Sequence, residues 1–123
     1  MTMLKDYYTG RLHIMVFDTR EAMGRKAGEQ AARRIRNLLG DKEVVNVIFA
    51  AAPSQNETLK TLVNADGIDW TRVNAYHMDE YVGLDPGHPA GFCNYLKRMV
   101  FDLLPFRSIN LINGNTDNPD AEA

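Results

Sequence analysis

Two adjacent acidic residues, Asp79 and Glu80, directly follow an apolar segment of the chain. A carboxylate at the end of a strand, partly removed from water, can have a raised pKa and act as a general base. Because successive strand residues point to opposite sides, only one of the two acids can face a given pocket. The residues alone leave two interpretations open: a general base, or a solvated turn in which Glu80 caps a neighbouring helix.

A second candidate is the segment 51–55, with sequence Ala-Ala-Pro-Ser-Gln, which follows the most apolar predicted strand. A strand that runs into a helix start presents free backbone N–H groups and the positive end of the helix dipole, an arrangement that favours phosphate. Ser54 adds a hydroxyl, and Glu57 three residues later completes a capping-box pattern. The alternative is an ordinary helix cap, because the segment lacks the glycines that let a backbone wrap closely around phosphate.

The three histidines are weaker candidates. We interpret His77, inside a predicted strand, as a packing residue, and His13 as structural. His88 lies beside Pro89 in a glycine-rich loop, and is the histidine best suited to an exposed functional role. The spacing of His77, Asp79 and Glu80 along one strand does not favour convergence on one metal ion, so we expect no metal site and no cofactor.

The acidic pair and the segment 51–55 can form one site only if the fold brings the ends of their two strands together. The pattern predicts one α/β domain over residues 1–123, with a parallel sheet and flanking helices in a doubly wound, Rossmann-like arrangement that is truncated. A glycine- and proline-rich loop is expected at 82–91. The expected strands are 12–17, 44–52, 73–78 and 108–112, and the expected helices are 20–39 (ended by Gly40), a short one after Ser54, and 92–104.

The composition restricts the partners. The chain has 14 basic and 16 acidic residues, a net charge of -2, which gives no broad positive field for nucleic acid or anionic membrane. A single cysteine, Cys93, excludes a disulfide within the chain and fits a cytoplasmic protein. No apolar run has the ~20 residues of a membrane span.

The strings Ile-Asp-Trp-Thr-Arg-Val at 68–73, His-Met-Asp-Glu-Tyr-Val-Gly-Leu at 77–84, and His88-Pro89 resemble the glucosamine-6-phosphate deaminase/isomerase family. Residues 109–115 are similar to the family's next strand and turn, so the resemblance covers almost the whole chain from about residue 12. The wider fold family includes 6-phosphogluconolactonases and sugar-phosphate-sensing domains of bacterial regulators. The resemblance implies a sugar phosphate as the small-molecule partner and a homo-oligomer.

The resemblance also implies roles for residues. The family converts glucosamine 6-phosphate and water to fructose 6-phosphate and ammonia. Asp79 matches its general base, which moves a proton between C1 and C2 of the opened sugar, and Glu80 completes the catalytic pair by orienting the loop. Ala51, Ala52, Ser54 and Gln55 fall on the phosphate loop, and His88 belongs to the implied substrate-binding set. The sequence departs from the family where Ala52 replaces a glycine, where Pro53 removes an N–H donor, and near Gly91, where the family often has serine.

Length is the larger departure. Family members are considerably longer, and their second half carries the ring-opening histidine, its acidic partners and basic residues that hold phosphate. We therefore expect this chain to correspond to the N-terminal half and to show no deaminase turnover alone. Two alternatives are a non-catalytic sugar-phosphate-binding module, and a self-associating fragment whose exposed strand edge pairs with another copy.

Overall fold

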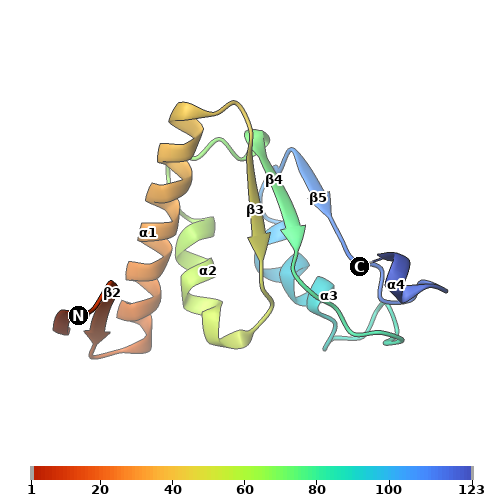
Figure 1. Cartoon of the computed structure of the whole chain (residues 1–123), viewed down its shortest axis with the longest axis horizontal. Coiled ribbons are helices and arrows are strands. Elements are labelled where there is room, and N and C mark those ends of the chain that lie inside the picture. Colours follow the sequence, from red (N-terminus) through yellow and green to blue (C-terminus); the bar gives the residue numbers. More distant parts are fainter. Residues whose placement is uncertain (1, 123) are drawn as a thin grey trace.

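The structure is a computed structural model that describes residues 2–122 (Figure 1). A hairpin precedes an alternating succession of helices and strands. Short 3-10 turns occupy Pro53–Gln55 and Trp70–Arg72, and one π-helical turn, Lys97–Phe101, continues α3. The elements are β1 (Met3–Thr9), β2 (Leu12–Phe17), α1 (Arg20–Asp41), β3 (Val45–Phe49), α2 (Asn56–Val63), β4 (Val73–His77), α3 (Phe92–Leu96), β5 (Ser108–Asn110) and α4 (Pro119–Glu122).

The central sheet is parallel and has the strand order β3-β4-β5 (Figure 1). Its register aligns Val45 with Val73 and Phe49 with His77, so β3 and β4 end at the same edge. Helices connect consecutive strands, as parallel pairing requires. The predicted α/β class, with a parallel sheet and flanking helices, is confirmed, although the three strands are shorter than expected at their carboxyl ends.

The expected membership of residues 12–17 in that sheet is wrong. β2 pairs antiparallel with β1 in a separate hairpin, and the polar sequence of β1 had given no strand signal. Gly10 adopts a φ of 59°, which permits the tight turn between Thr9 and Leu12. His13 stacks on Tyr8 and hydrogen-bonds the Asp6 carboxylate across the two strands. These contacts account for the structural role predicted for His13.

Helix α1 begins where the sequence predicts and ends slightly later. Thr19 caps it, because its hydroxyl accepts the Ala22 N–H at 3.1 Å. Gly40 does not end the helix: its φ is not positive, and the helix continues to Asp41 before Lys42 donates back to the Leu38 carbonyl. No helix within residues 2–122 is long and apolar enough to cross a membrane.

Two glycines of α1 let it lie directly against α2. A Cβ at Gly28 would sit 2.6 Å from the Thr61 Cβ and 2.7 Å from the Thr58 carbonyl oxygen. A Cβ at Gly24 would collide with Glu57. The close approach therefore fixes α2, and with it the segment that leads into α2 from β3.

The core lies between the helices and one face of the sheet. On the opposite face, Ile48 is 61% and Tyr76 is 36% exposed, and a hydrogen-bonded polar row runs from Asn46 through Asn74 to Ser108. Within the described residues, the buried core is thus on one side of the sheet only. Its members come from α1, β3, α2, the turn before β4, β4 itself, and α3 with the turn that follows it: Ala32, Ile35, Leu39, Val45, Phe49, Leu59, Leu62, Trp70, Val73, Ala75, Tyr95, Leu96, Val100 and Phe101.

Gly28→Ala should lower the free energy of unfolding by about 1 to 3 kcal/mol, because the added methyl group overpacks the contact with Thr61. Gly40→Ala is the matched control. It lies in the same helix with no atom within 4 Å of the added methyl, so stability should stay unchanged or rise slightly. Urea unfolding of both variants measures the difference, and equal effects would contradict the tight α1–α2 packing.

Candidate active site

The two candidate segments lie at neighbouring strand ends. The Met78 N–H donates to the Phe49 carbonyl at 3.1 Å, which extends the β3–β4 pairing by one step. The candidate phosphate loop (residues 51–55) follows β3, and the acidic turn (residues 78–81) follows β4. Both segments therefore lie at the carboxyl edge of the sheet, where open α/β folds bind ligands (Figure 1).

Asp79 and Glu80 occupy different environments. Asp79 is exposed, so the described residues do not supply the partial burial expected for a desolvated base. The Glu80 carboxylate turns inward to α3 and accepts the N–H of Phe92 and the N–H of Cys93, each at 2.9 Å. Gly91, the residue at the N-cap position, has no side chain that could do this. The interpretation of Glu80 as a helix cap is therefore confirmed.

The Glu80 carboxylate is ionised by this geometry. Burial by itself would raise its pKa, but the N–H groups of Cys93, Phe92 and Tyr81 together outweigh the burial and hold the pKa below its ordinary value. The nearby His77 ring acts in the same direction. Glu80 is thus a negative charge held against the first turn of α3, where it satisfies otherwise unpaired donors.

His77 lies behind Glu80 in the core. Its side chain is fully buried, and its Nδ1 accepts the Ile112 N–H at 3.3 Å, which links the ends of β4 and β5. The opposite nitrogen, Nε2, has no hydrogen-bond partner within the described residues and lies 3.7 Å from a Glu80 oxygen. The predicted packing role of His77 is confirmed.

The start of α2 differs from the prediction. The capping box of Ser54 and Glu57 does not form: a 3-10 turn starts after Ala52, and no side chain caps it or α2. Glu57 instead binds Arg20 of α1 at 2.8 Å. Pro53 at the first position of the turn explains the change, because its fixed φ begins the turn one residue before Ser54.

The candidate phosphate loop is held by side chains from inside and outside it. The Gln55 amide binds the Ala50 carbonyl, and Arg20 donates to the Pro53 carbonyl at 2.6 Å. The Tyr95 hydroxyl of α3 lies 2.8 Å from the Ala52 carbonyl oxygen. Ser54 remains exposed, with its hydroxyl at the surface. No local pattern indicates these roles of Arg20 and Tyr95, because their partners lie 33 and 43 positions away along the chain.

His88 belongs to an ordered turn. Its Nδ1 accepts the Ala90 N–H at 3.0 Å, and its own carbonyl oxygen accepts the amide of Asn94 and the N–H of Gly91. The side chain is exposed, as expected from its loop position. The hydrogen bonds of His88 stay within the loop and α3. They do not connect His88 to Asp79 or to the candidate phosphate loop.

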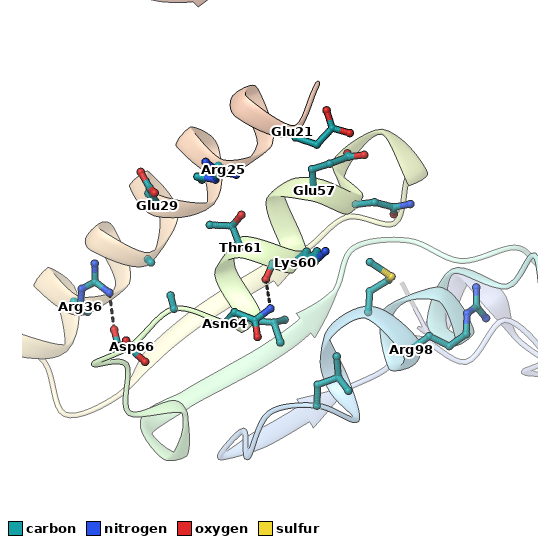
Figure 2. A pocket seen from close by; sticks show the side chains of 16 residues that line it. Glu21, Arg25, Glu29, Arg36, Glu57, Lys60, Thr61, Asn64, Asp66 and Arg98 are labelled. Carbon is teal, nitrogen blue, oxygen red and sulfur yellow. Dashed lines mark hydrogen bonds between the residues drawn. The ribbon is translucent and has the colours of Figure 1, made fainter. Parts of the chain in front are cut away.

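A wide groove lies away from these residues. A groove of about 880 Å³ runs between α1, α2 and the π-helical turn, lined by charges of both signs, and contains none of the predicted site residues (Figure 2). Arg36, one of these charges, binds the Asp66 carbonyl at 2.6 Å (Figure 2). A smaller cavity of about 150 Å³ lies beside Glu80, between the 80–91 loop and residues 112–115. Within residues 2–122, no cluster of His, Cys, Asp and Glu is arranged to hold a metal ion.

Glu80→Gln should reduce the free energy of unfolding at pH 7 by about 1 to 2 kcal/mol, because the charge on the N–H groups of α3 is lost. The folded-state pKa of Glu80 is below its unfolded value, so the contribution of the carboxylate is present above the unfolded pKa. It disappears as the pH falls through the folded pKa, and the two proteins should then converge. Urea unfolding from pH 7 to pH 3 tests this, with exposed Glu43→Gln as control; a gap that does not narrow as the pH falls would contradict the assignment.

No protein-family model matches the chain. A glucosamine-6-phosphate deaminase of Actinobacillus pleuropneumoniae is 30% identical over 117 residues, which are 90% of this chain and 44% of that enzyme. Another, from Exiguobacterium, is 38% identical over 77 residues, 63% of this chain and 30% of that enzyme. The chain thus spans less than half the length of these relatives.

Solved structures show the same fold. A monomeric glucosamine-6-phosphate deaminase of the NagB superfamily aligns with a TM-score of 0.69 at 22% identity, over 86% of this chain and 44% of that one. A 6-phosphogluconolactonase from Shewanella baltica aligns with a TM-score of 0.68 at 15% identity, over 84% of this chain and 43% of that one. The resemblance carried by residues 77–84 is confirmed: the chain is related to the N-terminal portion of the glucosamine-6-phosphate deaminases and shares the fold of their superfamily.

Proposed function

We propose that this chain supplies the sugar-phosphate-binding and proton-transfer part of a glucosamine-6-phosphate deaminase/isomerase-like site. The observation that carries the proposal is the position of Asp79 at the carboxyl edge of the sheet, beside the candidate phosphate loop. Relatives of this chain are glucosamine-6-phosphate deaminases, which supports the substrate class. Homo-oligomerisation, a cytoplasmic location and the absence of nucleic-acid partners remain predictions from the sequence.

The hydrogen bonds favour different roles for the two acids. Each Glu80 oxygen already accepts a backbone N–H, so Glu80 acts as a positioning residue for the acidic turn. Asp79 is exposed and available to a ligand. As general base, Asp79 would take the proton from C2 of the opened amino sugar, next to the C1 aldehyde, and return it to C1 through an enolamine intermediate. Enclosure of the carboxylate by the bound sugar would supply the desolvation that the free chain lacks.

The phosphate group would bind at the start of α2. The Ser54 hydroxyl and the Ser54 backbone N–H would donate hydrogen bonds there, helped by the helix dipole, whereas the Gln55 N–H already donates to the Ala52 carbonyl. Pro53 offers no N–H, so this loop has one donor fewer than a glycine-rich loop. We therefore expect weaker phosphate binding than in a loop with glycine at that position.

A non-catalytic sugar-phosphate-binding module is the second candidate. The exposure of Asp79 and the loss of a donor at Pro53 favour it. The two candidates share the ligand and differ in proton transfer, so exchange of a sugar proton with solvent separates them.

The chain alone should release no ammonia from glucosamine 6-phosphate, because it spans less than half the length of its deaminase relatives and the family's ring-opening histidine belongs to the other part. An ammonia assay with purified chain, against a complete deaminase as positive control, measures this. Steady release at a rate typical of enzymes would overturn the expectation.

In a longer protein that joins this chain to the family's second half, Asp79→Asn should abolish exchange of the C2 proton of glucosamine 6-phosphate with D₂O, while the dissociation constant changes by less than about threefold, since the amide keeps the size of the side chain but cannot accept the proton. Proton NMR follows the exchange, and calorimetry follows binding. The matched control is Asp102→Asn, an exposed acid that precedes β5.

Exchange retained in Asp79→Asn would remove Asp79 from the mechanism. Binding without exchange in the longer protein with Asp79 unchanged would favour the non-catalytic module instead. Absence of both binding and exchange would contradict either form of the proposed function.

A further inference from the structure

Both candidate segments are tied to the same short helix. The Glu80 carboxylate binds the N–H groups of Phe92 and Cys93 in the first turn of α3. Two residues after Cys93, the Tyr95 hydroxyl reaches the opposite segment and lies 2.8 Å from the Ala52 carbonyl oxygen. Helix α3 therefore links the acidic turn to the candidate phosphate loop, although the two segments are separated by α2 in the sequence.

The Tyr95 hydroxyl holds both ends of the loop. Besides Ala52, it lies 2.6 Å from the Asn56 side-chain oxygen at the first residue of α2. A phenol has one proton, so the two acceptors share it in a three-centre hydrogen bond. Pro53, Ser54 and Gln55 lie between these two anchor points. Burial raises the pKa of Tyr95, so the hydroxyl keeps its proton at neutral pH.

The loop has hydrogen bonds of its own, from the Gln55 amide to the Ala50 carbonyl and from the Gln55 N–H to the Ala52 carbonyl. No side chain among residues 2–122 caps the 3-10 turn or α2, so contacts from other helices add to these local bonds. Arg20 also contacts the Pro53 carbonyl, but its side chain is about half exposed, whereas Tyr95 is only 8% exposed. A buried hydrogen bond is held more firmly than an exposed one, because water does not compete for its donor.

We propose that Tyr95 is a positioning residue for phosphate recognition: its hydroxyl fixes the candidate phosphate loop on α3 and thereby sets the placement of Ser54 relative to Asp79. The inference rests on the proposed function for its ligand, but the contact itself is a property of the free chain. The aromatic ring fills the core, and the hydroxyl alone carries the positioning role.

Tyr95→Phe separates these contributions, because it keeps the ring and removes the hydroxyl. The affinity for glucosamine 6-phosphate should fall about tenfold, since the Ala52 carbonyl loses its only side-chain donor among the described residues, keeps the Gln55 N–H alone, and the loop relaxes. Inorganic phosphate should lose affinity by the same factor, because the effect is at the phosphate end. Tyr76→Phe, which removes a hydroxyl on the open face of the sheet, is the matched control and should leave both affinities unchanged.

Two measurements keep the outcomes distinct. Calorimetry gives the affinities, and ¹⁵N–¹H NMR of the free chains should show amide shifts and faster hydrogen exchange in residues 51–57 of Tyr95→Phe, beyond the shifts expected next to the substituted residue itself. Asn56→Ala removes one of the two acceptors of the Tyr95 hydroxyl and should give a smaller change in the same amides. It replaces Tyr95→Phe as the test variant if Tyr95→Phe folds poorly. Unchanged loop amides in these variants, or unchanged affinity despite binding by the parent chain, would overturn the inference.

A parent chain that binds neither probe would contradict the proposed function. In that case, comparing the amide shifts and hydrogen exchange of residues 51–57 between the free parent chain and free Tyr95→Phe would still show whether Tyr95 positions the loop.

Discussion

The carboxylate of Glu80 on the first turn of α3 is the contact on which the rest of the candidate site depends. A helix of five residues is too short to be stable by itself, and its first N–H groups need partners. The N-cap residue, Gly91, cannot provide one, so the partner comes from a residue eleven positions earlier in the chain. This bond closes the intervening loop and holds Asp79, the preceding residue, at the edge of the sheet. His77 supports it from the core.

A second constraint follows from the candidate phosphate loop. A glycine-rich loop can shape itself through its own backbone, whereas residues 51–55 contain an alanine pair and a proline. Its carbonyl groups are therefore held by Arg20 from α1 and Tyr95 from α3. The geometry of the loop thus depends on helix packing, including the close approach of α1 and α2 at Gly28. A substitution in α1, α2 or α3 can therefore change ligand binding by moving the loop, even if the substituted residue does not contact the ligand.

The sequence predicts what local patterns encode. It shows the apolar runs of β3 and β4, their alternation with helices, and the acidic turn that follows β4. For Glu80 it leaves two interpretations open, one of which is the helix cap that the structure contains. The hairpin was missed because the exposed residues of β1 carry no alternating pattern. The cap by Ser54 failed because Pro53 begins the turn earlier. Tyr95 could not be found, since its partner Ala52 is 43 positions away and only the fold brings them together.

A titration of ¹⁵N-labelled chain with glucosamine 6-phosphate, followed through its backbone amides, tests the central claim most directly. If the sugar phosphate binds at the carboxyl edge of the sheet, amides of residues 51–55 and 78–81 should shift together and saturate with one dissociation constant. Amides that line the groove between α1 and α2, such as those of Glu29 and Lys60, should not move. Shifts confined to that groove, or no shifts at millimolar ligand, would contradict the account.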